Sequence, residues 1–239
     1  MRKQNTIAIN ADLGEGMEND VQLIPYLSYA NIACGGHAGS ETVIEQTILL
    51  ANQHKVRVGA HPSYPDIENF GRKSMAISQS ALELSLLNQI KLFEEIAIQL
   101  KVSMHHIKLH GALYNDVFRS AKKTQWFLNW SATHFKNSTL FIPCGAKQFM
   151  PKNYPNIIYE AFADRNYNAD LSLVSRNEIN AILQTPEVVV KHVQQMLLEH
   201  TVTSVEGKKV AMKPDTFCLH GDHPNVLPIA KSIYNLSVE

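Results

Sequence analysis

The sequence predicts an α/β fold, an irregular β/α barrel with seven strands. Seven short apolar runs are typical of buried strands, at about 6–12, 29–34, 56–61, 104–110, 139–144, 157–163 and 215–220. Helical patterns separate several of these runs, which favours βα repeats and a mainly parallel sheet. Six runs end in a histidine or an acid and then break into glycine, proline or a turn. Ionisable groups at several strand ends fit a closed barrel better than an open sheet, whose site lies at one switch point. With seven strands in place of eight, we expect an irregular barrel that could be open at one seam.

Two serines mark the starts of the most clearly predicted helices. Ser40 is a suitable N-cap for a helix that ends near residue 54. Ser78 opens a helix with a continuous apolar stripe as far as Leu100. The other two predicted helices cover 121–135 and 186–200. The second begins with a proline, which suits a first helical turn.

One segment near the C-terminus resembles a small hairpin added to the barrel. Residues 202–211 would form it, with the turn at Glu206 and Gly207. We find no low-complexity tract, long linker or charge block that would divide the chain. Residues 1–239 are therefore expected to form a single β/α-barrel domain that carries this hairpin.

Composition and charge argue against several classes of function. The chain has 239 residues, and its 22 Lys and Arg balance 22 Asp and Glu. Nucleic-acid and anionic-membrane partners normally require a basic patch, so neither is expected. No apolar stretch approaches the roughly 18 residues of a membrane-spanning helix. The N-terminus leads into the first strand without the apolar region of a signal peptide, so the expected location is cytoplasmic.

Candidate site residues follow the first two strands. Asp12 and Glu15 lie in the sequence Asp-Leu-Gly-Glu. Such a pair can supply a general base and a partner that shifts its pKa, although an N-cap and a first-turn acid of the next helix are an equal alternative. His37 lies among three glycines, which allow a ligand to approach the backbone closely.

The third strand ends at His61 and leads into a long loop at 62–77. We expect this loop to lie over the mouth of the barrel, where a lid or substrate clamp would be placed. Within it, Arg72 could bind a carboxylate or a phosphate with two hydrogen bonds, or it could be a solvated surface charge.

Lys108 and His110 give the strongest indication of a site. They are two residues apart, so on a strand both side chains face the same way. A lysine that points into a barrel is costly unless it is paired. The pattern therefore implies a carboxylate neighbour or an anionic substrate.

The last two strands also end in ionisable residues. Asp164 and Arg165 end the sixth run, and His220 ends the seventh. Asp222 follows two residues later, where it could orient the imidazole and raise its basicity. Arg176 is another cation that could reach the mouth. The sequence has no phosphate-binding glycine loop, no Gly-x-Ser-x-Gly elbow and no His-Glu-x-x-His motif.

Seven phrases in order, between about residues 7 and 232, resemble the LamB/YcsF family. They are Asn-Ala-Asp-Leu-Gly-Glu, Ala-Asn-Ile-Ala-Cys-Gly-Gly-His-Ala-Gly, Gly-Ala-His-Pro-Ser-Tyr-Pro-Asp, Phe-Gly-Arg, Lys-Leu-His-Gly-Ala-Leu-Tyr-Asn, Phe-Ala-Asp-Arg-x-Tyr and His-Gly-Asp-x-Pro. The resemblance implies an irregular barrel of the glycoside hydrolase/deacetylase type. It also implies the A component of a bacterial 5-oxoprolinase, which converts 5-oxo-L-proline to L-glutamate with ATP hydrolysis and works with two partners, the B and C subunits. One departure is Leu171, where many relatives have glycine.

The resemblance makes the strand-end residues candidates for a shared site. The catalytic candidates are Asp12, Glu15, His37, His61, Lys108, His110, Asp164 and His220, and the substrate-binding candidates are Arg72, Arg165 and Asp222. ATP would be a co-substrate that the partner subunits handle, since this chain lacks a nucleotide loop. Asp12 or His61 would then activate water for ring opening.

Two other functions remain open at this point. A metal-dependent N-deacetylase or amidohydrolase could hold a divalent ion with Asp12, His37 and His61, or with His110 in place of one histidine. Whether a metal is bound does not follow from the sequence. Alternatively, the barrel could be a component that binds 5-oxoproline without catalysing a reaction.

Overall fold

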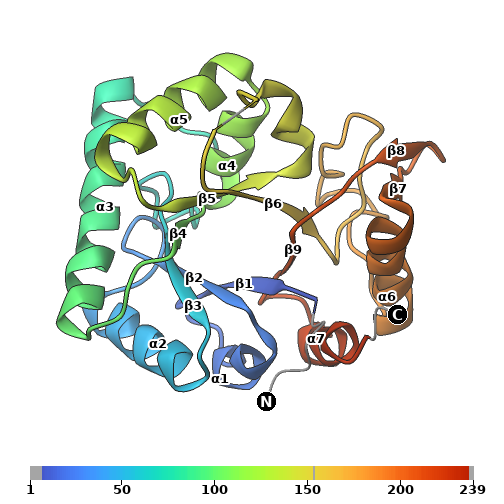
Figure 1. Cartoon of the computed structure of the whole chain (residues 1–239), viewed down its shortest axis with the longest axis horizontal. Coiled ribbons are helices and arrows are strands. Elements are labelled where there is room, and N and C mark those ends of the chain that lie inside the picture. The colour runs from blue at the N-terminus through green and yellow to red at the C-terminus, as the bar shows by residue number, and fades with distance from the viewer. Residues whose placement is uncertain (1–6, 153, 237–239) are drawn as a thin grey trace.

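The computed structural model, which describes residues 7–152 and 154–236, contains a closed barrel of seven parallel strands (Figure 1). Around the ring the order is β1-β2-β3-β4-β5-β6-β9. Pairing of Ile9 with Phe217 and of Phe162 with Cys218 closes the last gap, so the expectation of an open seam is wrong. The strands are β1 (Ile9–Leu13), β2 (Tyr29–Ala33), β3 (Arg57–His61), β4 (His106–Ile107), β5 (Thr139–Pro143), β6 (Ile157–Phe162) and β9 (Thr216–Leu219).

Helices surround the ring of strands (Figure 1). The four predicted helices are present, and each is capped by a side chain, from Ser40, Ser78, Ser120 and Thr185 in turn. The remaining helices were not predicted from the sequence. The helices are α1 (Asp20–Leu23), α2 (Glu41–Gln53), α3 (Gln79–Gln99), α4 (Gly111–Phe118), α5 (Ala121–His134), α6 (Pro186–Gln194), α7 (Val226–Tyr234), two 3₁₀ helices (Ile24–Tyr26 and Cys144–Phe149) and a π-helical segment (Gln195–Glu199) that extends α6.

The strand expected at 104–110 is much shorter than predicted, because β4 contains only two residues. The chain nevertheless continues beside β3 in an extended path. Lys108 donates its backbone N–H to Ala60, and His110 donates its own to Pro62. Helix α4 then begins immediately after His110. The side chains of both residues therefore remain at the end of the barrel despite the short strand.

The expected hairpin is present beside the barrel. Strands β7 (Thr201–Thr203) and β8 (Lys209–Ala211) pair in antiparallel fashion. Gly207 in the connecting turn has a φ of +77°, a conformation that favours glycine. The predicted start of the first strand at residue 6 and the predicted lack of a leader in residues 1–5 lie outside the described residues.

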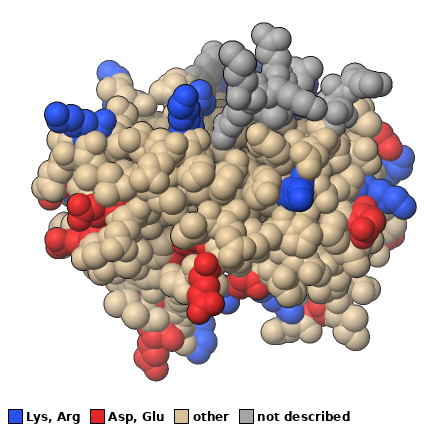
Figure 2. Space-filling model, turned by 90° about the horizontal axis from the view of Figure 1, so that it is seen from below, with Lys and Arg blue, Asp and Glu red and all other residues tan. Residues whose placement is uncertain are grey.

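Charged side chains on the outside of the molecule are mixed in sign. Figure 2 shows Lys and Arg interspersed with Asp and Glu, separated by wide uncharged areas, on the face seen from below. Among the described residues, no helix has the length and apolar character needed to cross a membrane.

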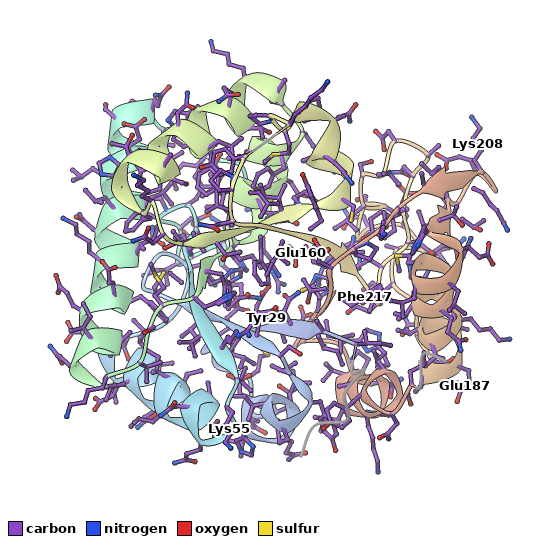
Figure 3. The ribbon with its side chains drawn as sticks, in the orientation of Figure 1. Tyr29, Lys55, Glu160, Glu187, Lys208 and Phe217 are labelled. Carbon is purple, nitrogen blue, oxygen red and sulfur yellow. The ribbon has the colours of Figure 1, made fainter. Side chains whose placement is uncertain are left out.

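The interior of the barrel is polar through much of its height. A hydrogen-bonded chain runs from His106 through Asn31 and Asn10 to Glu160 and Thr216. All five residues are buried, and Figure 3 shows Glu160 inside the ring of strands. Buried polar groups of this kind must be satisfied by one another. This network lies inside the barrel, below the C-terminal ends of the strands.

Candidate functional site

A cavity of about 400 Å³ opens at the C-terminal ends of the strands, where β/α barrels place their sites. Eight of the eleven site residues predicted from the sequence line it, and the other three are buried against those that do. The three buried residues are His37, His61 and Asp164. The residues that line the cavity are Asp12, Glu15, Arg72, Lys108, His110, Arg165, His220 and Asp222.

Lys108 lines the cavity and is 2% exposed. Its Nζ lies 3.0 Å from Asp12 Oδ1 and 3.2 Å from Glu160 Oε2. Burial alone would lower the pKa of Lys108, but the charge of Asp12 and the other neighbours outweighs it and holds this pKa well above its usual value. Lys108 is therefore a fixed cation. The carboxylate neighbour that the sequence implied is present.

Asp12 is the ionised partner of this lysine. Burial opposes ionisation, yet the charges of His61 and Lys108 hold the pKa of Asp12 well below its usual value. Asn31 also donates a hydrogen bond of 2.8 Å to Asp12 Oδ1. A carboxylate that is stabilised in this way is a weak base.

Glu160 is a buried acid that was not selected from the sequence. It lies within the sixth apolar run, between Tyr159 and Ala161, and its side chain points into the barrel. The sequence did contain a signal for Glu160, since it is an acid in the middle of an apolar run. An acid is rarely buried without a partner, so its position could have indicated a buried, paired carboxylate.

Glu15 and three histidines form a compact cluster beside Asp12. Glu15 Oε1 lies 2.7 Å from His37 Nε2, 3.3 Å from His110 Nδ1 and 3.8 Å from His61 Nε2. The rings of His37 and His110 stack with their centroids 3.6 Å apart. Burial lowers the pKa of both His37 and His110 to about 3, which keeps these imidazoles neutral. Neutral imidazoles and a carboxylate are suitable metal ligands.

The metal candidates named from the sequence therefore change in one respect. Glu15, rather than Asp12, has its carboxylate among the histidine nitrogens, in a group whose ligand atoms all lie within 4.8 Å of one another. Asp12 Oδ2 lies beside this group, 3.2 Å from His61 Nε2.

His220 and Asp164 form a second acid–base unit on the other side of the cavity. His220 Nδ1 lies 2.9 Å from Asp164 Oδ1, and the backbone N–H of His220 donates to Asp164 Oδ2. A carboxylate only accepts here, so Nδ1 carries a proton and Nε2 is the ring nitrogen that remains for contact with a substrate. The expectation that Asp222 orients His220 is wrong, because Asp164 occupies that position.

Asp222 instead pairs with two arginines at the mouth of the cavity. Its Oδ2 lies 2.9 Å from Arg72 and 3.1 Å from Arg176. Arg165 lies deeper and donates hydrogen bonds to the backbone carbonyls of Val174 and Ala181. These contacts hold the 166–183 segment over the cavity.

The loop at 62–77 contacts the site as expected, and two glycines allow the close approach. A Cβ on Gly111 would lie 2.6 Å from the carbonyl oxygen of Gly71, and both residues have positive φ. Phe70 in the same loop accepts a hydrogen bond from His110 Nε2. The loop therefore fixes the orientation of a site histidine.

A second cavity of about 450 Å³ adjoins the first. The two share lining residues on α4, β6 and the 166–183 segment, among them Tyr114, Arg119 and Phe162. None of these three residues was selected as a site residue from the sequence. Tyr114 and Arg119 lie on α4 and at its C-terminal end, and α4 was not predicted, whereas Phe162 was interpreted only as an apolar residue of the sixth strand.

Both the sequence and the fold of this chain are similar to those of known proteins. Residues 7–238 match the model of the LamB/YcsF family. The A component of a 5-oxoprolinase from Bacillus cereus (strain B4264) is 40% identical over 96% of this chain and 94% of its own length. The protein of the same name from Bacillus anthracis (strain CDC 684 / NRRL 3495) is 38% identical over the same shares. The crystal structure of a lactam utilization protein from Thermus thermophilus is similar with a TM-score of 0.83, at 30% identity over 96% of this chain and 95% of that one.

Proposed function

Because the chain belongs to the LamB/YcsF family, we propose that it is the A component of a 5-oxoprolinase and opens the lactam ring of 5-oxo-L-proline. The product is L-glutamate, and the reaction is coupled to ATP hydrolysis with the B and C subunits. The observation that carries this proposal is the cavity that holds Lys108, Asp12 and His220 together at the ends of the strands. Its volume of about 400 Å³ is in the range of small-molecule sites.

A lactam needs activation because its amide is resonance-stabilised. Transfer of the γ-phosphoryl group of ATP to the lactam oxygen turns that oxygen into part of a leaving group. One water then adds to the same carbon and the C–N bond breaks, with the ring nitrogen taking up a proton. A second water releases phosphate from the acyl phosphate and leaves the glutamate carboxylate. The sequence has no phosphate-binding glycine loop, so the partner subunits handle ATP.

Each side of the cavity has a separate task in this proposal. Lys108 faces the reacting oxygen with a fixed positive charge, which stabilises the negative charge that develops there. Arg72 and Arg176 at the mouth attract the carboxylate of the substrate. His220, oriented by Asp164 through Nδ1, moves the protons through its other ring nitrogen, Nε2. Asp12 is assigned to holding Lys108 in place, since its low pKa makes it a poor base.

The first experiment follows glutamate formation from 5-oxoproline, with and without ATP, for this chain alone and with its partners. We expect turnover only with ATP and the partner subunits. Efficient ATP-dependent turnover by the isolated chain would refute the division of labour.

The second experiment tests the His220–Asp164 unit with Asp164→Asn, which preserves size and removes the charge. Turnover should fall by roughly 10²–10⁴-fold, the contribution of a general acid or base. Glu95→Gln, which removes the charge of an exposed carboxylate on α3 outside both cavities, is the control and should leave the rate unchanged. A normal rate in folded Asp164→Asn would remove this unit from the mechanism.

The cluster of Glu15 with three histidines favours one alternative, a metal-dependent hydrolase of N-acyl groups. This enzyme would need no ATP. Release of acetate from an N-acetylated substrate without ATP, together with no glutamate from 5-oxoproline, would support the alternative over the main proposal.

A further inference from the structure

The imidazoles of His37, His61 and His110 each turn one ring nitrogen toward Glu15. The three histidines are between 1% and 6% exposed, so water does not surround these nitrogens. The protonation of the rings must therefore be explained by the neighbouring protein groups.

Backbone carbonyls determine which nitrogen carries the proton in two of the three rings. His61 Nδ1 lies 2.8 Å from the carbonyl oxygen of Lys108, and His110 Nε2 lies 3.0 Å from that of Phe70. A carbonyl oxygen can only accept a hydrogen bond, so each of these nitrogens is a donor. If neither ring carries a second proton, lone pairs remain on His61 Nε2 and His110 Nδ1.

These two nitrogens face each other at 3.0 Å. Glu15 Oε1 adds a third acceptor, 3.3 Å from His110 Nδ1 and 3.8 Å from His61 Nε2. With no second proton on either ring, these lone pairs and that of Glu15 Oε1, which also contacts His37 Nε2 at 2.7 Å, repel one another unless a positive centre lies among them. A single proton bridges only two of these atoms, whereas a metal ion binds all of them.

We propose that Glu15, His37, His61 and His110 bind a divalent transition-metal ion of the zinc type. Imidazole nitrogens suit Zn²⁺ and its neighbours, whereas Mg²⁺ and Ca²⁺ prefer oxygen ligands. With bonds of about 2.0–2.1 Å, tetrahedral ligand atoms lie about 3.3–3.4 Å apart. The separations of 2.7, 3.0, 3.3 and 3.8 Å in the cluster bracket this value.

The surroundings of the cluster also match those of metal sites. Ligating histidines usually donate the second ring N–H to a carbonyl or carboxylate, which fixes the tautomer and the ring orientation. His61 and His110 both do so. Glu15 and His110 line the cavity, so the ion would lie at the wall of the space that the proposed substrate occupies. A catalytic role for the ion rests on the proposed function, but binding of the ion does not.

Metal binding can be measured without any assay of turnover. The purified chain is stripped with a chelator, dialysed against Zn²⁺ and analysed for bound metal, and Co²⁺ absorption reports the ligand set. We expect a single ion per chain, not displaced by Mg²⁺. Glu15→Gln and His110→Ala should weaken binding by at least roughly 10–100-fold, the loss seen on removing even outer partners of metal sites. His134→Ala, at an exposed histidine, is the control and should bind as the parent does.

Circular dichroism identifies variants that fail to fold, and His61→Gln replaces any that do. A folded parent chain that binds no Zn²⁺ above background would overturn the proposal, as would unchanged affinity in the folded variants. Zn²⁺ bound at the cluster without 5-oxoprolinase activity would support the metal site and reject the proposed function. Full ATP-dependent turnover by metal-free enzyme would reject a catalytic role for the ion and leave the proposed function intact.

Discussion

Lys108 and Asp12 form an ion pair, with Nζ and Oδ1 3.0 Å apart, at the inner end of the cavity. The lysine also contacts Glu160, which is fully buried. One cation thus balances two carboxylates that have little access to water. Breaking such an arrangement leaves uncompensated buried charge.

The change Lys108→Met should therefore destabilise the fold. We expect the free energy of unfolding to fall by about 3–5 kcal/mol, the cost of removing one partner of a buried ion pair. Urea unfolding of the parent and the variant measures it. Lys209→Met is the matched control, because Lys209 pairs with Glu199 in an exposed position. That change should cost less than about 1 kcal/mol. Equal losses in the two variants would contradict the assignment of Lys108 as a structural cation.

Much of the site could be predicted because its residues come directly after apolar strands. Asp12, His61 and His220 each end such a run, and the C-terminal ends of parallel strands meet at one end of a barrel. The same reasoning identified Lys108, whose apolar neighbours implied that it is buried. Local sequence therefore indicated which side chains would meet.

The partners within the site could not be predicted in the same way. Asp164 and His220 are 56 residues apart and pair only because β6 and β9 are neighbours in the ring. Asp222 is the acid nearest to His220 in the sequence, but in the structure it pairs with Arg72. Helix α4 was missed because its start follows a two-residue strand, and the apolar run there was extended too far. Such pairings depend on which strands are neighbours in the closed barrel, and local sequence patterns do not predict that order.

His192 in α6 predicts how stability responds to acid. Burial lowers the pKa of this histidine to about 4, although the backbone of Arg165 and the charge of Asp164 act in the opposite direction. The ordinary pKa of a histidine is about 6.5, so between these values the unfolded chain binds more protons than the folded one. Stability from His192 is therefore complete above pH 6.5 and is lost as the pH falls toward 4.

Replacing His192 by a residue that cannot bind a proton should make the free energy of unfolding less sensitive to acid. The parent should lose about 2 kcal/mol through His192 between pH 7 and pH 5, and His192→Phe should lose that much less. Urea unfolding at the two pH values measures the difference. His134→Phe, at an exposed histidine, should respond to acid like the parent. The same acid response in His192→Phe and the parent would contradict the burial argument.

Leu171 has a left-handed backbone conformation, with a φ of +65°. This region costs an L-residue roughly 1–2 kcal/mol, whereas glycine adopts it readily. The resemblance to relatives that have glycine here left the shape of this loop open, and the structure shows the conformation that glycine favours. Leu171 also packs against Gly145, so truncating its side chain loses contacts in any variant.

Comparing the stabilities of two variants truncated at Leu171 separates the effect of backbone strain from that of side-chain packing. Leu171→Gly and Leu171→Ala lose nearly the same contacts, but only alanine keeps the strain. We therefore expect the glycine variant to be more stable by roughly 1 kcal/mol. Leu84, exposed inside α3 beyond its first turn, is the control position, and there alanine should be the more stable by about 1 kcal/mol. Urea unfolding of the four variants tests both orders. If Leu171→Ala is at least as stable as Leu171→Gly, the loop does not carry this strain.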